Sequence, residues 1–155
     1  MKLHEIVTAL IEHKITIATA ESCTGGKIAA AITDVPGASE IFGYGMVTYS
    51  NDAKIKILGV KEETLAAHGA VSPETAYEMA AGLKRVSGAD VAVSVTGIAG
   101  PGGGSPEKPV GLVYMGIAYG NDVFVKKNLF QGERDEVRLQ TVETALHFVA
   151  EKVLK

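Results

Sequence analysis

The chain has 155 residues, of which 46% are hydrophobic and 21% charged, and its formal net charge is −3. This balance is typical of a globular protein with a full hydrophobic core, and it predicts one domain over residues 1–155. Because the net charge is negative, we expect no nucleic acid and no anionic membrane surface as partner. The single cysteine, Cys23, excludes an internal disulfide and a cysteine-rich zinc site.

The N-terminal segment predicts an amphipathic helix over residues 2–13, because its apolar side chains recur at helical spacing. Glu5 and Glu12 interrupt this segment, whereas a secretory signal needs an uncharged apolar run. Elsewhere, charged residues or glycines interrupt every apolar run well before the roughly 20 residues of a membrane-spanning helix. We therefore expect a cytoplasmic protein.

The next elements follow from β-branched runs, helix formers and turn residues. Ile15–Ala20 predicts a buried strand, and a glycine-containing turn leads from it into a helix over 28–33. Asn51 is the expected cap of a short helix that ends at Gly59. The further elements predicted in this half are a strand over 41–50 and short helices over 52–58 and 62–68.

In the second half, Ser72 followed by Pro73 predicts the start of a helix that runs to about Ser87. The elements after it are a strand over 90–96, a glycine- and proline-rich loop over 97–109, strands over 110–119 and 123–130, and a helix over 133–154. So few turn residues separate the last two strands that they should form an antiparallel hairpin. We predict an α/β fold, a layered α/β/α domain with a mixed sheet of about five strands.

A polar turn, ESCTGG, follows the first predicted strand. Free backbone N–H groups converge where a strand leads into a helix, so this turn can bind an anion or place a hydroxyl beside an oxyanion hole. The alternative is that its hydroxyl side chains only cap the helix. The candidate residues in the turn are Ser22, Cys23, Thr24, Gly25 and Gly26.

A second glycine-rich segment, GIAGPGGG, follows the strand that ends at Thr96. It lacks the Gly-Lys-Ser/Thr ending of a P-loop, and no helix follows it as in a dinucleotide site. Long ordered loops in compact domains are more often functional than idle, and ligands in open α/β sheets gather at strand ends. We therefore expect a ligand cleft here, with Gly102, Gly103, Gly104 and Ser105 as candidates for binding a phosphate.

A serine nucleophile needs a base, and none of the four histidines lies in a glycine-rich turn. Lys54 is the alternative, because it lies one turn into the helix after the second strand and could reach back over the sheet end. A lysine acts as a base only when burial or a nearby positive charge lowers its pKa. The other interpretation is that Lys54 is a solvated surface lysine.

Arg134 and Arg138 lie four residues apart at the start of the last predicted helix, so they share one face. With the free N–H groups of that helix, they could bind a phosphate or a carboxylate. The alternative is that they pair with Glu133 and Asp135 on a solvated surface.

Five segments of the chain carry a family pattern: TAESCTGG, GYGMVTYSNDAKIKILGV, HGAVSPETAYEMA, SVTGIAGPGGGSPEKPVGLVY and FQGERDEVRLQTVETAL. In this order and at this spacing they resemble the C-terminal domain of the competence/damage-inducible protein CinA. That family includes free-standing nicotinamide-nucleotide amidases of the PncC type. The molybdopterin-binding-like domain of full-length CinA has no counterpart here, so the resemblance is to the stand-alone amidase form.

The resemblance implies hydrolysis of nicotinamide mononucleotide to nicotinate mononucleotide and ammonia, in the recycling of pyridine nucleotides, without a metal or organic cofactor. The family's motif serine matches Ser22, and the lysine of its YSN-x-x-K segment matches Lys54, so the two are expected to form a Ser–Lys pair. Thr96 matches a Ser/Thr position that supports one of them, and Tyr49 is expected at the substrate. We further expect a homo-oligomer, a dimer or higher.

Two other functions stay open at this point. One is a non-catalytic nucleotide-binding or regulatory domain of the competence/damage-inducible type, and the other is a hydrolase of a different small amide. The combination of Ser22, Lys54 and Thr96 favours an enzyme, because a binding domain has no need of a basic lysine near a serine.

Overall fold

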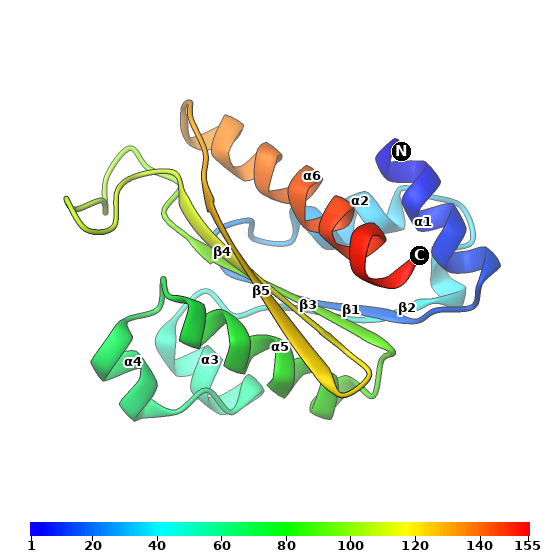
Figure 1. The fold of residues 1–155 in the computed structure, drawn as a ribbon, viewed down its shortest axis with the longest axis horizontal. Helices are drawn as coiled ribbons and strands as arrows, with labels where there is room; N and C mark the ends of the chain where they lie inside the picture. The colour runs from blue at the N-terminus through cyan, green and yellow to red at the C-terminus, as the bar shows by residue number, and fades with distance from the viewer.

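A five-stranded sheet lies between two layers of helices in the computed structural model, which describes residues 1–155 (Figure 1). The elements in chain order are α1 (Leu3–Glu12), β1 (Ile17–Glu21), α2 (Lys27–Thr33), the 3-10 helix η1 (Ala38–Glu40), β2 (Phe42–Val47), α3 (Asn51–Leu58), α4 (Glu62–His68), α5 (Pro73–Ser87), β3 (Val91–Gly97), β4 (Leu112–Tyr119), β5 (Asp122–Leu129) and α6 (Arg134–Val153).

The strand order across the sheet is β2-β1-β3-β4-β5. Strands β2, β1 and β3 run parallel, whereas β4 is antiparallel to β3 and β5 is antiparallel to β4. This arrangement confirms the predicted mixed sheet and the predicted hairpin. Because three parallel strands end at the same edge, the segments that follow β1, β2 and β3 meet there.

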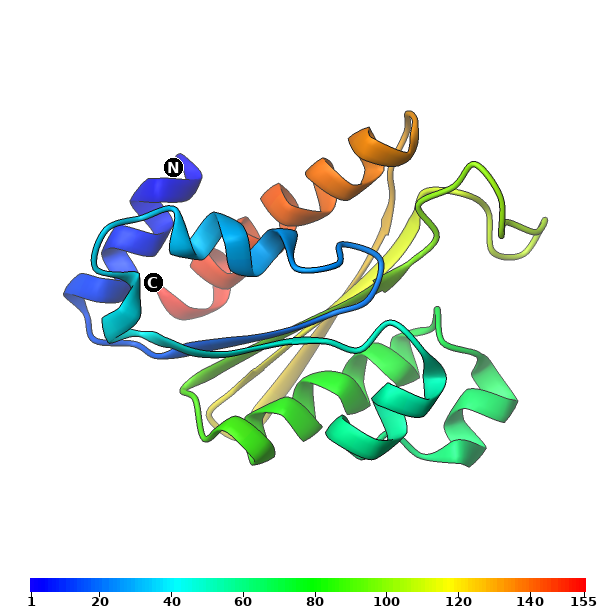
Figure 2. The same ribbon diagram turned by 180° about the vertical axis from the view of Figure 1, so that it is seen from behind.

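The helices divide between the two faces of the sheet, with α1, α2 and α6 on one face and α3, α4 and α5 on the other (Figures 1 and 2). A hydrophobic cluster of 23 buried residues lies beneath the first set, and a smaller cluster of 10 lies beneath the second. Strand β1 is buried along its whole length, as expected for a strand with parallel neighbours on both sides and helices on both faces of the sheet.

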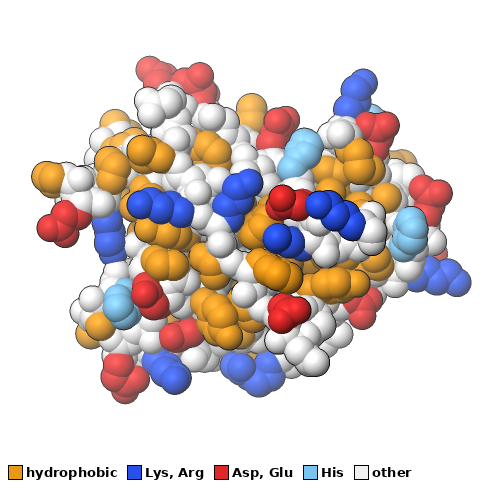
Figure 3. All heavy atoms as spheres, in the orientation of Figure 1, with side chains coloured by type: hydrophobic (Ala, Val, Ile, Leu, Met, Phe, Trp, Pro, Cys, Tyr) orange, Lys and Arg blue, Asp and Glu red, His pale blue; other side chains and the backbone are white.

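The surface carries charges of both signs. On the face seen in Figure 3, acidic and basic side chains are interspersed among hydrophobic ones rather than separated by sign. No helix combines the length and the hydropathy that crossing a bilayer would require.

Helix α3, which carries Lys54, is held in place by contacts at both of its ends. Ser50 caps its start, since Ser50 Oγ accepts a hydrogen bond from the Ala53 N–H at 3.0 Å. The prediction that Asn51 is the cap is therefore wrong by one residue. At its C-terminal end α3 rests against Gly82 of α5, where a Cβ atom would lie 1.8 Å from the Leu58 carbonyl oxygen. Only glycine allows this approach of the two helices.

Candidate active site

The structure brings Ser22 and Lys54 together at the carboxyl edge of the parallel strands. Ser22 follows β1 directly, and Lys54 reaches back from the first turn of α3. Lys54 Nζ lies 3.0 Å from Ser22 Oγ, at hydrogen-bond distance. The two residues are 32 positions apart in the sequence, so only the crossover from β1 to α3 makes them neighbours.

Lys54 is buried, with 1% of its surface exposed, and no carboxylate forms an ion pair with it. Burial lowers its pKa to about 8, because water no longer solvates the ammonium, while the nearby Cys23 acts weakly in the opposite direction. The interpretation of Lys54 as a solvated surface lysine is therefore wrong.

The partners of Lys54 also orient its nitrogen. Besides Ser22 Oγ, Nζ donates to the carbonyl oxygens of Thr48 at 2.8 Å and Tyr49 at 3.3 Å. Carbonyl oxygens can only accept, so a neutral amine directs its two N–H groups at them. Its lone pair then faces the Ser22 hydroxyl, which is the arrangement that a general base needs.

The turn after Ser22 contains backbone N–H groups without acceptors. The Ser22 N–H donates to the Val95 carbonyl and the Gly25 N–H donates to the Ser22 carbonyl, both at 3.1 Å. No acceptor faces the N–H groups of Cys23, Thr24 and Gly26. Of the N–H groups of residues 23–26 that were expected to stabilise an oxyanion, these three are therefore the ones that are free to do so.

Ser22 and Lys54 line a cavity of about 210 Å³, together with Cys23, Tyr49, Ala70, Val71, Thr96, Gly97, Ala99 and Arg134. A second cavity of about 680 Å³ shares Ala99 and Arg134 with the first and extends to the start of α6. The two spaces are therefore adjacent, a small one at the Ser–Lys pair and a larger one beside it. This division suits a ligand with a small reacting group on a larger body.

Thr96 lines the small cavity, but its hydroxyl forms no hydrogen bond with Ser22 or Lys54. Its hydroxyl donates to the Ala70 carbonyl at 2.8 Å, which fastens the segment that supplies Ala70 and Val71 to the cavity wall. The expected support of Ser22 or Lys54 by Thr96 is therefore not a direct hydrogen bond in this structure.

Arg134 and Arg138 line the larger cavity, and neither forms an ion pair with Glu133 or Asp135. Arg134 Nη1 donates to the Gly100 carbonyl at 2.8 Å, and Nη2 approaches the Tyr49 hydroxyl at 3.4 Å. The solvated ion-pair alternative for these arginines is therefore wrong. Arg138 bonds instead to the turn after Ser22.

The segment Gly102–Ser105 lies outside both cavities. All four residues are exposed, and the Ser105 N–H and hydroxyl bond to Lys108 within the same loop. The segment lines neither cavity, and its binding of a phosphate stays a prediction.

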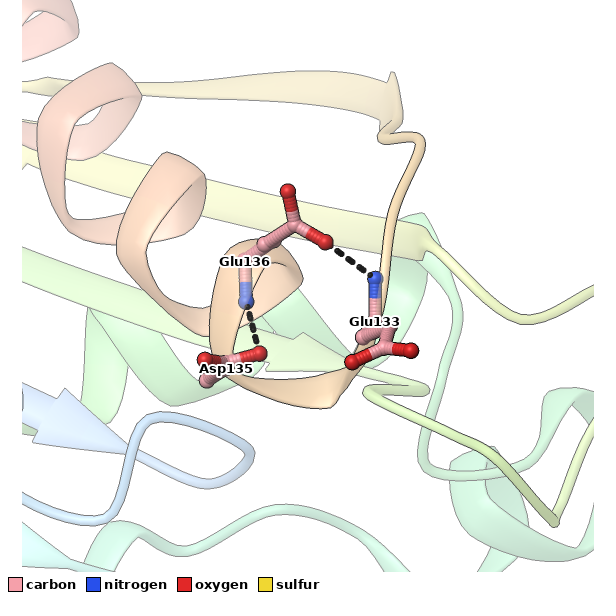
Figure 4. A group of neighbouring side chains, drawn as sticks. All are labelled: Glu133, Asp135 and Glu136. Carbon is pink, nitrogen blue, oxygen red and sulfur yellow. Dashed lines mark hydrogen bonds between the residues drawn. The ribbon is translucent and has the colours of Figure 1, made fainter.

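Three acidic side chains gather at the start of α6: Glu133, Asp135 and Glu136 (Figure 4). Glu136 Oε1 accepts from the Glu133 N–H at 2.9 Å, and Asp135 Oδ1 accepts from the Glu136 N–H at 3.0 Å. The carboxylates therefore satisfy backbone donors at the helix end, where negative charge is favourable.

Sequence reasoning missed Glu21, the last residue of β1. Its side chain is 1% exposed, and its carboxylate accepts three hydrogen bonds from the segment that follows. The available signal was a charged residue at the end of an apolar strand, directly before the candidate nucleophile.

The CinA C-terminal domain model matches residues 2–153. A putative competence-damage inducible protein of Caldanaerobacter subterraneus subsp. tengcongensis is 56% identical over 149 residues, covering 96% of this chain and 36% of that protein. A relative of the same description from Moorella thermoacetica is 53% identical over 140 residues, covering 90% and 34%. The chain thus spans about a third of the length of the curated relatives that it matches.

Solved structures share the fold closely. The competence/damage inducible protein CihA from Agrobacterium tumefaciens superposes with a TM-score of 0.93 at 46% identity, covering 96% of this chain and 94% of that one. The competence damage-inducible protein A from Klebsiella pneumoniae gives a TM-score of 0.93 at 36% identity, covering 99% and 98%. A family model over nearly the whole chain, relatives above 50% identity and matching structures agree: this chain belongs to the CinA C-terminal domain family.

Proposed function

We propose that this protein is an amidase that deamidates nicotinamide mononucleotide to nicotinate mononucleotide and ammonia. The observation that carries the proposal is a buried lysine without a carboxylate partner whose nitrogen lies 3.0 Å from a serine hydroxyl. A binding domain gains nothing from burying an uncompensated lysine, which is unfavourable, whereas a nucleophile gains an activating base.

In the first half of the reaction, Ser22 Oγ attacks the carboxamide carbon while Lys54 Nζ takes the hydroxyl proton. The free N–H groups after Ser22 stabilise the negative charge on the carboxamide oxygen. Lys54 then returns the proton to the leaving nitrogen, the C–N bond breaks and ammonia departs. The product of this half is an ester between the nicotinoyl group and Ser22.

In the second half, water attacks the ester carbon while Lys54 takes its proton. The bond to Ser22 Oγ breaks, the proton returns to the serine, and nicotinate mononucleotide leaves as the carboxylate. The pyridinium charge of the substrate withdraws electrons from the amide and favours the neutral form of Lys54. The chemistry needs no group beyond those in the chain and one water molecule.

The direct test is ammonia release from nicotinamide mononucleotide by the purified chain, with nicotinamide and nicotinamide riboside as comparison substrates. The amidase proposal expects turnover that is fastest on the mononucleotide. Tight binding of the mononucleotide without any ammonia release would favour the nucleotide-binding alternative. Faster release from an unrelated small amide would keep the chemistry and replace the substrate.

Arg134 is the proposed anchor of the nucleotide phosphate, because it lines both cavities at the start of α6. Arg134→Ala is expected to lower kcat/KM for nicotinamide mononucleotide about 10–150-fold, as for a lost charge-assisted contact of ~1.5–3 kcal/mol. The loss on the phosphate-free riboside should be much smaller. Equal losses on both substrates would instead assign Arg134 to the structure of the cavity. Lys152→Ala, which removes an exposed cation at the other end of α6, is the control.

The pKa of Lys54, about 8, predicts how activity depends on pH. The base must be neutral, so kcat/KM should rise nearly tenfold per pH unit below 8 and level off above it. The free energy of unfolding should also rise as pH increases from 8 towards 10.5, because the unfolded chain there holds a proton that folded Lys54 has released. A rate profile that is flat between pH 6.5 and 9 would contradict the role of Lys54.

A further inference from the structure

The turn Ser22–Gly26 is held from one side by the Glu21 carboxylate. The N-cap position of helix α2 is Gly26, which has no side chain to accept hydrogen bonds, so another group must accept from the first N–H donors of the helix. Glu21 Oε1 accepts from the Ile28 N–H at 2.8 Å and Oε2 from the Ala29 N–H at 3.0 Å. Glu21 Oε1 also accepts from the Thr24 hydroxyl at 2.5 Å.

This carboxylate already occupies the helix end that the sequence suggested for a ligand's anion. Glu21 is buried and forms no ion pair, so its charge is balanced by the helix N–H groups and one hydroxyl. A phosphate cannot bind at the start of α2 without displacing it. The anion at the start of α2 is therefore the chain's own Glu21 carboxylate rather than a phosphate of the substrate.

Arg138 holds the same turn from α6. Its Nε donates to the Cys23 carbonyl at 3.0 Å and its Nη2 to the Thr24 carbonyl at 3.1 Å. Gly25 has a φ of +58°, and a Cβ atom at this position would lie 3.2 Å from Arg138 Nη2. The glycine thus permits both the left-handed turn and the close approach of the guanidinium.

These two contacts fix the directions of peptide groups. A trans peptide is planar, and its C=O and N–H point in opposite directions. When Arg138 binds the Cys23 carbonyl, it therefore also sets the direction of the Thr24 N–H, which has no acceptor. Glu21 meanwhile holds the Thr24 side chain, so Thr24 is fixed by an anion through its hydroxyl and by a cation through its backbone.

We propose that Glu21 and Arg138 are positioning residues that hold the Ser22–Gly26 turn between opposite charges. They keep the Ser22 hydroxyl at Lys54 and keep the free N–H groups after Ser22 in place for the transition state. The inference rests on Ser22 being the nucleophile of the proposed amidase. It also gives Arg138 a different role from the phosphate binding expected from the sequence.

The experiment measures the rate at which a small alkyl fluorophosphonate labels Ser22, followed by intact mass, beside ammonia release from nicotinamide mononucleotide. In labelling, a bond forms from Ser22 Oγ to phosphorus, the P–F bond breaks, fluoride leaves and the serine proton passes to Lys54. Labelling depends on the nucleophile and its turn but not on the natural substrate, so it tests the inference separately from the proposed function.

Glu21→Gln and Arg138→Met are each expected to lower both the labelling rate and kcat about 10–100-fold, because displacement of a nucleophile by about 1 Å has effects of this size. KM for nicotinamide mononucleotide should change less than about threefold. Arg138→Lys should recover part of the loss, since it keeps the charge but not the two-pronged donor geometry. The matched controls are Glu143→Gln, an exposed carboxylate of α6, and Lys152→Met, an exposed cation near the other end of the same helix. Both controls should stay within about twofold of the wild-type rate.

If Glu21→Gln and Arg138→Met lower Tm but label at the wild-type rate well below that temperature, the residues are only structural and the inference is overturned. Should either variant fail to fold, Thr24→Val decides, because it removes only the hydroxyl that Glu21 binds; an unchanged labelling rate would overturn the inference. A wild-type protein that labels but releases no ammonia refutes the proposed function alone. A wild-type protein that does not label has no activated serine to position, and the inference fails.

Discussion

Replacing Ser22 by alanine is expected to lower ammonia release from nicotinamide mononucleotide by at least about 10³-fold, as for the loss of a catalytic nucleophile. The fold should persist, because one hydroxyl at a turn contributes only about 0.5–1.5 kcal/mol of hydrogen bonding. Circular dichroism and the melting temperature check the fold, and a discontinuous ammonia assay checks the rate.

Ser87→Ala is the matched control, since Ser87 lies at the end of α5 and its hydroxyl bonds only within that region, to the Leu83 carbonyl and the Ala89 N–H. Its activity should equal that of the wild type. A Ser22→Ala enzyme that keeps more than a tenth of the wild-type rate would exclude Ser22 as the nucleophile.

Lys54→Arg is expected to be nearly as damaging as Lys54→Ala, with kcat lowered about 10²–10⁴-fold in both, the range typical of a lost general base. Arginine keeps the positive charge, but it does not release its proton in proteins and so cannot accept one from Ser22. Lys54→Met should fold at least as well as the wild type, because it fills the same buried space without a charge.

The control for this series is Lys56→Arg on the same helix, where the lysine is largely exposed and pairs with Asp52 at 3.3 Å. That change should leave kcat unaltered. Substantial turnover by Lys54→Arg would make Lys54 an electrostatic contact to the substrate, and the proposed mechanism would then need another base.

The order of the elements and the class of the fold could be predicted because their signals are local. Helix starts such as Ser72-Pro73 and the apolar runs of β1 and β3 lie within a few neighbouring residues, and the structure confirms them. The exception is the cap of α3, where Ser50 and Asn51 are both good capping residues and local sequence does not choose between them.

The environment of each side chain in the site could not be predicted from local sequence. Lys54 lies on a short helix whose other lysine, Lys56, is exposed, and Lys54 is buried only because the fold packs α3 against α5 and brings its side chain to Ser22. Arg138 bonds to Cys23 across 115 positions, and Thr96 bonds to Ala70 across 26. Such contacts depend on how crossovers place distant segments, and hydrophobic periodicity carries no information about that.

The contact between Gly82 and the end of α3 gives an engineer a way to change the distance between nucleophile and base without touching either. A methyl group at position 82 would meet the Leu58 carbonyl at 1.8 Å, so α3 would have to retreat from α5 by at least about 1 Å. Lys54 moves with that helix, whereas Ser22, which directly follows β1, stays in place. Gly82→Ala would thus increase the distance between Ser22 and Lys54 from a distant helix. Its effect on turnover would measure how much separation of the two residues the chemistry tolerates.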